Sequence, residues 1–130
     1  MIKKLTVLLG GFMALNTYAA PLINLFELGV AQGKTAQYNQ VAKHNISMSI
    51  ANEKGTLAMY SVKQKDNPEI AYMVEIYADD AAYQIHLNSP QYQTFAKTSP
   101  EILTDHKKRI ALEPRFLGDK KIQQPSTATP

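Results

Sequence analysis

The residues best suited to chemistry lie in one stretch, EIYADDAAYQIHLNSPQYQTF, which holds His86 with three tyrosines and a phenylalanine close to it in sequence. A histidine exchanges a proton near neutral pH, so His86 could act as general base on a phenol. The second interpretation is structural, in which His86 orders the chain break at Ser89-Pro90 by hydrogen bonding to the backbone. Its apolar neighbours Ile85 and Leu87 indicate close packing there, and the sequence leaves both interpretations open.

Aromatic and polar side chains on neighbouring strand-like segments could complete a pocket around such a base. Tyr60, Tyr72 and Tyr77 could line it and hydrogen-bond to a phenolic ligand, or they could serve packing alone. Asn24, on an apolar segment, could bind substrate or face a sheet edge. Glu75 is predicted to be structural, as half of an ion pair at an interface, with a polar pocket group as the alternative.

The residue types available do not indicate metal or thiol chemistry. The sequence has no cysteine, which leaves out disulfides and thiolate nucleophiles. The histidines His44, His86 and His106 fall in different predicted elements without the spacing of metal ligands. We therefore predict no metal site.

The amino terminus, MIKKLTVLLGGFMALNTYAAP, is typical of a secretory signal peptide. Lys3 and Lys4 precede an uncharged apolar run, and Thr17 and Ala19 are small residues at the spacing that a signal peptidase accepts. We predict a signal peptide over residues 1–19 and a periplasmic or secreted mature protein without a stable membrane anchor. An uncut helical anchor is the alternative, but the apolar run is shorter than the ~20 residues that a membrane span needs.

The charge of the mature chain excludes one class of partner. The full sequence has 14 basic and 11 acidic residues, and loss of residues 1–19 removes two lysines, which leaves 12 against 11. A mature chain with this balance lacks the excess of basic residues that nucleic-acid binding needs, so we do not predict a nucleic-acid partner. The basic cluster Lys107-Lys108-Arg109 is interpreted as a solvated strand entrance. Residues 123–130 read QQPSTATP, and we predict that they form a disordered tail. Residues 20–122 are predicted to form one domain.

Apolar periodicity and turn residues predict four strands and two helical regions. The first helix closes near Gly55, a glycine suited to a left-handed cap. The second begins at Asp79 or Asp80, and Ser-Pro pairs at Ser89 and Ser99 restart it. The predicted strands cover residues 22–30, 56–64, 70–78 and 106–118, and the helices cover residues 34–54 and 81 onward.

The order strand, helix, strand, strand, helix, strand predicts an α+β fold, the ferredoxin-like βαββαβ antiparallel sheet with helices on one face. The other face would normally be polar, yet both sides of the central hairpin are apolar. One predicted face of the third strand carries Tyr72, Val74 and Ile76, and in the second strand Leu57 and Met59 share a face. We infer a homodimer whose sheets pack together, an apolar cavity, or both.

Two stretches, GTLAMYSV at residues 55–62 and PEIAYMVEIYADDAAYQIHLNSPQYQTF at residues 68–95, together resemble the antibiotic biosynthesis monooxygenase (ABM) superfamily, and its quinol monooxygenase-like branch most closely. The resemblance extends over residues 22–116. Tyr77 stands where the family usually has tryptophan, and the signal peptide is unusual among these relatives. The residues that carry the resemblance are Gly55, Leu57, Tyr60, Glu75, Asp79, Ala82, His86, Ser89, Pro90 and Phe95.

The resemblance implies a dimeric α/β barrel and a cofactor-independent monooxygenase that oxidises a small aromatic quinol or phenol with molecular oxygen. Some members do this without metal, flavin or haem, because an electron-rich phenolate can itself reduce oxygen. The pocket is expected between the sheet and the second helix. His86 and Tyr77 are the predicted catalytic residues, and the predicted substrate-binding residues are Tyr60, Tyr72, Met73 and Asn24.

Other functions remain open on the same fold. Haem-degrading relatives use an Asn, Trp and His triad, whose positions here hold Phe26, Tyr77 and Phe95 or Ala96, so haem degradation is not predicted. The alternative to the monooxygenase is a non-enzymatic, periplasmic, dimeric domain that binds a small ligand. Isomerase-like chemistry in the same pocket is a third possibility. An open apolar pocket that reaches His86 would favour an enzyme.

Overall fold

The computed structural model describes residues 20–120, 122 and 125 of the chain. The predicted signal peptide lies outside these residues, as does most of the predicted tail. The described elements, in chain order, are β1 (Leu22–Val30), α1 (Thr35–Asn52), β2 (Thr56–Lys63), β3 (Ile70–Tyr77), α2 (Asp80–Leu87), α3 (Pro90–Ile102) and β4 (Leu103–Leu112). No helix among the described residues is long and apolar enough to cross a membrane.

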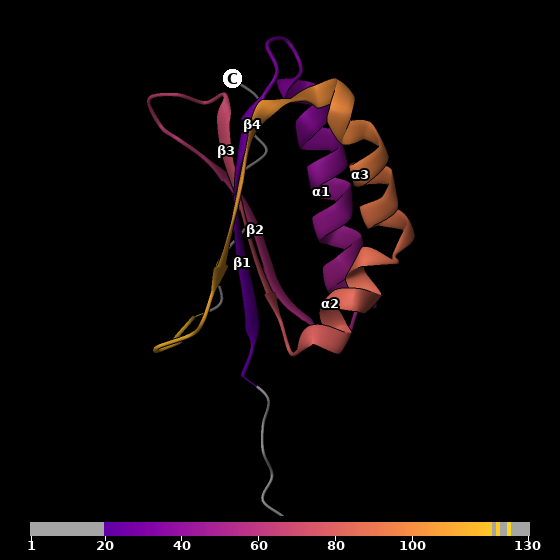
Figure 1. Cartoon of the computed structure of the whole chain (residues 1–130), viewed down its shortest axis with the longest axis vertical. Coiled ribbons are helices and arrows are strands. Elements are labelled where there is room, and N and C mark those ends of the chain that lie inside the picture. The colour runs from indigo at the N-terminus through magenta and orange to yellow at the C-terminus, as the bar shows by residue number, and fades with distance from the viewer. Residues whose placement is uncertain (1–19, 121, 123–124, 126–130) are drawn as a thin grey trace, which may run out of the picture.

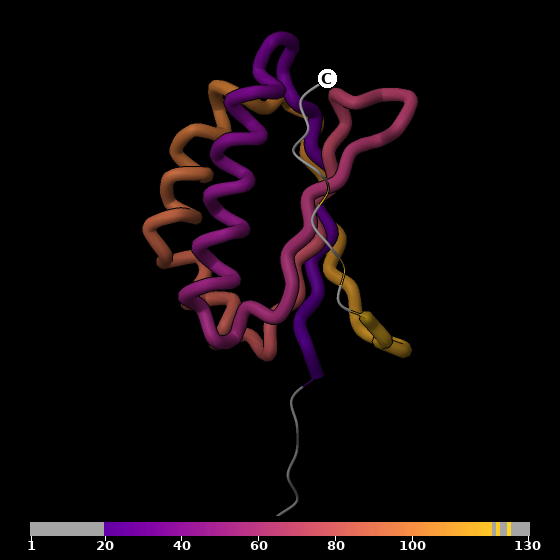
Figure 2. The backbone as a smooth tube through the Cα atoms, turned by 180° about the vertical axis from the view of Figure 1, so that it is seen from behind, coloured from indigo at the N-terminus to yellow at the C-terminus, as the bar shows by residue number. Residues whose placement is uncertain are grey.

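The four strands form one antiparallel sheet in the order β2-β3-β1-β4. All three helices lie on the same face of this sheet, and the opposite face carries no helix among the described residues (Figures 1 and 2). The predicted ferredoxin-like fold is therefore confirmed. β1 lies between β3 and β4, so Leu25 is paired with Val74 on one side and with Ile110 on the other.

The side-chain alternation of β3 separates the two faces. Its odd-numbered residues from Ala71 to Tyr77 are buried beneath the helices, whereas its even-numbered residues are half-buried on the other face. The buried residues of α1, at spacings of four, three and four, form the stripe that faces the sheet. The core between them contains Leu28, Val30, Tyr38, Ala42, Ala71, Met73, Ile102 and Leu103.

The caps around the second helical region follow the prediction. The Asp79 side chain accepts a hydrogen bond from the Ala82 N–H at 2.8 Å, which begins α2. The Ser89 hydroxyl accepts one from the Tyr92 N–H at 3.3 Å, and Pro90 occupies the first position of α3. These two caps separate α2 from α3 and turn the chain back along α1.

The second Ser-Pro pair does not restart a helix, contrary to the prediction. α3 continues through Pro100 to its end at Ile102. Pro100 has no N–H to donate to the carbonyl of Ala96, four residues earlier. The Ser99 hydroxyl donates to that carbonyl at 2.9 Å instead, so the last turn keeps its hydrogen bond.

Gly55 is needed for space and not for a left-handed cap, which corrects a second prediction. The positive φ among the described residues belongs to Gly33, at 76°, and Gly55 has none. A Cβ atom added to Gly55 would lie 2.4 Å from the Cβ of Ala82. The glycine therefore lets the start of β2 pass close to α2.

The second and fourth strands differ from the prediction in detail. A bulge between Thr56 and Ala58 shifts the register of β2, so Leu57 is exposed and does not share the buried face of Met59. β4 begins at Leu103, three residues before the predicted start. It ends at Leu112, and Pro114 follows outside the sheet, as its missing N–H requires.

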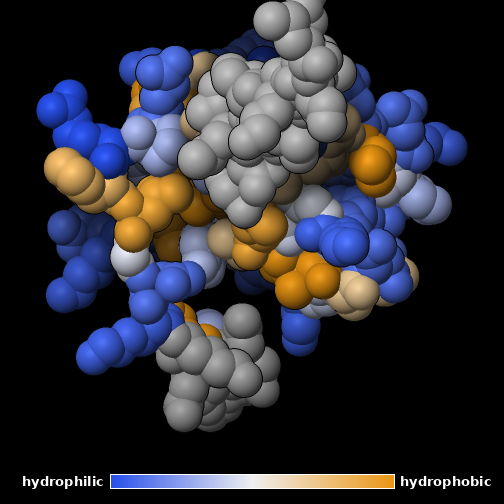
Figure 3. Space-filling model, turned by 90° about the horizontal axis from the view of Figure 1, so that it is seen from below, coloured by the Kyte–Doolittle hydropathy of each residue, from blue (hydrophilic) through white to orange (hydrophobic). Residues whose placement is uncertain are grey.

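The sheet face without helices is apolar and partly exposed. Tyr60 is 43% exposed and Val62 is 54% exposed, and Leu112 at the end of β4 is 41% exposed. Seen from its lower end, the molecule shows apolar surface in patches between hydrophilic residues (Figure 3). Exposed apolar area of this kind is typical of interaction surfaces.

Candidate functional site

A cavity of about 330 Å³ lies between the helix-bearing face of the sheet and the helices. Its floor contains a row across three strands, because Phe26 of β1 is paired with Met73 of β3 and with Arg109 of β4. The other lining residues are mainly apolar or aromatic. The complete lining is Phe26, Leu28, Asn45, Met73, Glu75, Tyr83, Leu87, Tyr92, Phe95, Ser99, Leu103, Lys107, Lys108 and Arg109.

Glu75 supplies the acidic group of this cavity lining. Its side chain is buried, and the Tyr77 hydroxyl donates a hydrogen bond to Oε2 at 2.8 Å. Burial raises the pKa of Glu75, while the hydrogen bond from Tyr77 and the positive charge of Arg109 act in the opposite direction. A carboxyl with a raised pKa in an apolar cavity is suited to exchange a proton nearer to neutral pH.

Tyr77 acts on the carboxyl of Glu75 as a hydrogen-bond donor. Burial, followed by the negative charge of Glu75, raises the pKa of Tyr77 far above its ordinary value. The hydroxyl therefore stays protonated and acts as the donor to Glu75. Tyr77 is completely buried and does not line the cavity.

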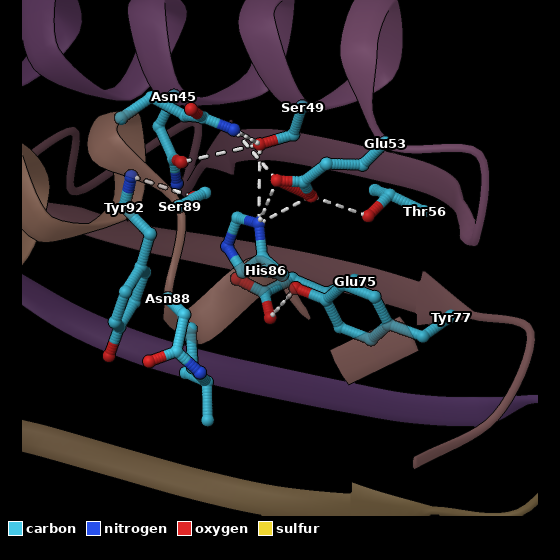
Figure 4. Close-up of polar contacts among 12 residues, drawn as sticks. Asn45, Ser49, Glu53, Thr56, Glu75, Tyr77, His86, Asn88, Ser89 and Tyr92 are labelled. Carbon is cyan, nitrogen blue, oxygen red and sulfur yellow. Dashed lines mark hydrogen bonds and ion pairs between the residues drawn. The ribbon is translucent and has the colours of Figure 1, made fainter. Parts of the chain in front are cut away.

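His86 belongs to a buried polar network that joins α2 to the end of α1. Its Nδ1 atom lies 2.8 Å from Oε1 of Glu53 and 3.2 Å from the hydroxyl of Ser49 (Figure 4). Glu53 also accepts hydrogen bonds from Thr56 and from Gln91, both at 2.7 Å. Three segments of the chain thus converge on one carboxylate, which is itself only 9% exposed.

The second ring nitrogen of His86 has no such partner. A neutral ring that donates from Nδ1 to Glu53 leaves a lone pair on Nε2. Nε2 is buried without a hydrogen-bond partner among the described residues. The ring lies between Tyr77 and Tyr92, with centroid distances of 5.5 and 5.1 Å. His86 is completely buried and lies outside the cavity lining, beside two of its members, Glu75 and Tyr92 (Figure 4).

A family model described as antibiotic biosynthesis monooxygenase matches residues 21–98, which include every strand except β4 and nearly all of the helical residues. The chain belongs to this family. The cavity and the His86 network both lie mainly within the matched residues. The family predicted from the sequence is therefore confirmed.

Solved structures agree with this assignment. A candidate antibiotic biosynthesis monooxygenase from Bacteriodes thetaiotaomicron is 26% identical, with a TM-score of 0.73 over 79% of this chain and 97% of that one. A candidate monooxygenase from Lactobacillus acidophilus is 25% identical, with a TM-score of 0.67 over 71% of this chain. One from Fusobacterium nucleatum, at 24% identity and a TM-score of 0.79 over 83% of this chain, shares the fold. The present chain covers 43% and 50% of the length of the last two.

Some of the residues that we proposed for the site from the sequence lie on the cavity side of the sheet, and others lie on the opposite face. Met73 lines the cavity, and Asn24 and Tyr77 are completely buried on the same face of the sheet. Tyr60 and Tyr72 do not wall this cavity, contrary to the expectation. Strand alternation places both on the face without helices, where Tyr60 is paired with Val74 and Tyr72 with Val62.

Arg109 and its neighbours on β4 are cavity residues that the sequence reasoning missed. The basic cluster was interpreted as a solvated strand entrance, and its three residues are indeed exposed, but Lys107, Lys108 and Arg109 also line the cavity. The Arg109 guanidinium donates two hydrogen bonds to Oδ1 of Asn24 and lies 5.5 Å above the ring of Tyr83. The alternation of β4 was the available signal, because it puts Lys107 and Arg109 on one face.

No group of three or more histidine, aspartate or glutamate side chains within the described residues could hold a metal ion. The cavity instead combines apolar walls, one buried carboxyl and a basic edge. This combination can hold a flat ring, accept a proton from it and stabilise a negative charge on it.

Proposed function

We propose that this ABM-family protein is a cofactor-independent monooxygenase that oxidises a small aromatic quinol or phenol with molecular oxygen. The observation that supports this proposal best is the cavity of about 330 Å³, with Glu75 buried among apolar and aromatic side chains. Its size suits a small aromatic molecule, and its apolar walls suit the faces of a ring. Membership of a family named for monooxygenases supports the reaction class.

In the proposed reaction, Glu75 accepts the phenolic proton, and the resulting phenolate passes an electron to oxygen. One oxygen atom becomes bonded to a ring carbon, and the other leaves as water with two hydrogens of the substrate, so no outside reductant is consumed. Tyr77 holds the carboxyl of Glu75 in place through its hydrogen bond. In this proposal the proton then passes from Glu75 to the neighbouring His86, at Nε2, which has no hydrogen-bond partner among the described residues.

Oxygen uptake with a panel of hydroquinones and anthrones tests this function directly. We expect wild-type protein to consume oxygen with at least one member of the panel and to form the oxygenated quinone. His86→Ala should reduce the rate by about 100-fold or more, because it removes the relay. A folded His86→Ala variant with the wild-type rate, or a wild-type protein that consumes no oxygen, would reject the mechanism.

We further propose that the protein is a homodimer whose subunits pack through the sheet face without helices. The exposed apolar side chains of Tyr60, Val62 and Leu112 support this arrangement. Sedimentation equilibrium should give twice the mass of the mature chain. Val62→Asp, which places a charge in the interface, should weaken association more than about tenfold. Gln40→Asp on the exposed side of α1 is the matched control, because it adds the same single charge away from the sheet. A monomeric wild type would exclude the dimer.

A second candidate function is binding of a small aromatic ligand without turnover. It is favoured by the complete burial of His86, which lies outside the cavity lining. In this case Glu75 would only orient a ligand. Tight binding of a phenol that is released unchanged, with no oxygen consumed by any panel member, would establish this function in place of the monooxygenase.

We also propose that the mature protein is periplasmic or secreted after cleavage following Ala19, on the basis of the amino-terminal sequence. Amino-terminal sequencing of the protein from a periplasmic extract should begin at Ala20. An intact amino terminus in the cytoplasmic fraction would exclude export.

A further inference from the structure

The cavity has a basic edge that the proposed oxidation does not use. β4 is the strand at one edge of the sheet (Figure 1). Its residues Lys107, Lys108 and Arg109 all line the cavity. None of them forms a salt bridge within the described part of the chain. Glu75, the acidic lining residue, is engaged by the Tyr77 hydroxyl. Lys107 and Arg109 point to the helix-bearing face of β4, so two basic side chains stand at the exposed edge of the cavity against one carboxyl, that of Glu75.

Contacts with Asn24 and Tyr83 hold the guanidinium of Arg109 in one orientation. Its Nε and Nη2 atoms donate to Oδ1 of Asn24 at 3.2 and 3.1 Å, and Asn24 is completely buried. The guanidinium also lies over the ring of Tyr83, another lining residue. These contacts fix the plane of the guanidinium and leave both Nη1 hydrogens and the second Nη2 hydrogen without a partner among the described residues. A group that is already oriented loses less conformational entropy when a ligand binds.

We propose that the cavity selects aromatic ligands that carry a carboxylate, which binds against Arg109 and Lys107 while the ring lies among the apolar side chains. A planar carboxylate accepts two parallel hydrogen bonds from a guanidinium, and such charge-assisted bonds are stronger than neutral ones. Phe26, Met73 and Phe95 offer the apolar surface for the ring. This inference adds a substrate preference to the proposed function. It rests on that function in one respect only, because both place the aromatic ring in the same cavity.

The test compares the affinities of two probes, naphthalene-2-carboxylate and naphthalene-2-carboxamide. The two molecules have nearly the same shape, but only the first carries a negative charge. Calorimetric titration of the wild-type protein should show at least about tenfold tighter binding of the carboxylate. Arg109→Gln keeps a donor for Asn24 but removes the charge, and it should abolish most of this preference. Lys107→Gln should reduce it in part.

The matched control is Lys65→Gln in the exposed β2–β3 loop, which removes the same charge outside the cavity. Its preference for the carboxylate should equal that of the wild type. Binding of the carboxamide should not change in any folded variant, and thermal melting identifies a variant that fails to fold. Because Lys107 has no role in holding Asn24, its variant tests the charge even where Arg109→Gln fails to fold.

Equal affinity for the two probes, no binding of either by the wild type, or an equal loss of preference in Lys65→Gln would overturn the inference. The proposed function is tested separately by oxygen uptake. Uptake with neutral quinols and no preference for the carboxylate would leave the monooxygenase standing without this selectivity. A clear preference for the carboxylate with no oxygen uptake would leave the selectivity standing without the monooxygenase.

Discussion

Replacement of Glu53 with alanine is expected to lower the free energy of unfolding by about 3–5 kcal/mol. The carboxylate accepts hydrogen bonds from His86, Thr56 and Gln91, all of them buried. The alanine variant leaves these donors without an acceptor inside the protein, and each buried donor that loses its partner costs about 1–3 kcal/mol. Urea denaturation, with the free energy extrapolated to water, measures the loss.

Two further variants make the stability result specific. Glu53→Gln keeps the shape of the side chain and one acceptor oxygen, so its loss should be smaller than that of the alanine variant. Glu69→Ala removes an exposed carboxylate, and its effect should stay within about 0.5 kcal/mol. A loss below about 1 kcal/mol for Glu53→Ala would mean that the network around His86 contributes little to the fold.

The largest expected effect on catalysis is that of Glu75→Gln, which should lower kcat by about 100-fold to 10,000-fold. Glutamine preserves the size of the side chain and can accept the hydrogen bond from Tyr77, but it cannot accept a proton from a phenol. The control is Glu101→Gln, an exposed carboxyl near the end of α3, which should keep the wild-type rate. Steady-state oxygen uptake measures both variants, and a Glu75→Gln rate close to wild type would exclude Glu75 as the base.

The pH dependence of the same reaction has a predictable direction. Only ionised Glu75 can accept the proton, so kcat/KM should fall as the pH drops through the pKa of Glu75. Burial raises this pKa, so the fall of kcat/KM on the acid side should occur above the ordinary glutamate pKa of 4.5. Tyr77→Phe removes a hydrogen bond that lowers the pKa, so this fall should move to still higher pH. A fall that moves to lower pH would contradict the assignment.

The elements of the fold were largely predictable because their signals are local. The caps at Asp79 and Ser89 work through side chains that reach backbone donors three residues away, and a sequence pattern records that distance. Ser99-Pro100 shows the limit of such patterns. It has the same letters as Ser89-Pro90, but the Ser99 hydroxyl satisfies a carbonyl inside a helix that continues.

Much of the site was not predictable, because several of its key contacts join residues far apart in the chain. His86 and Glu53 meet only when α2 lies against the end of α1. Arg109 meets Asn24 only when β4 is paired with β1. Tyr60 and Tyr72 were placed in the pocket because they are tyrosines on the central hairpin, and Tyr60 also because it belongs to the family pattern, but the strand alternation puts both on the other face.

The sequence by itself determined the family, the order of the elements and the presence of apolar side chains on both faces of the sheet. It did so because caps, turns and apolar periodicity depend on neighbours within a few residues. Only the tertiary structure decided which side chains line the cavity and what faces the ring nitrogens of His86. Those outcomes depend on strand register, on the bulge in β2 and on the packing of α2 and α3 over the sheet, which bring distant residues into contact.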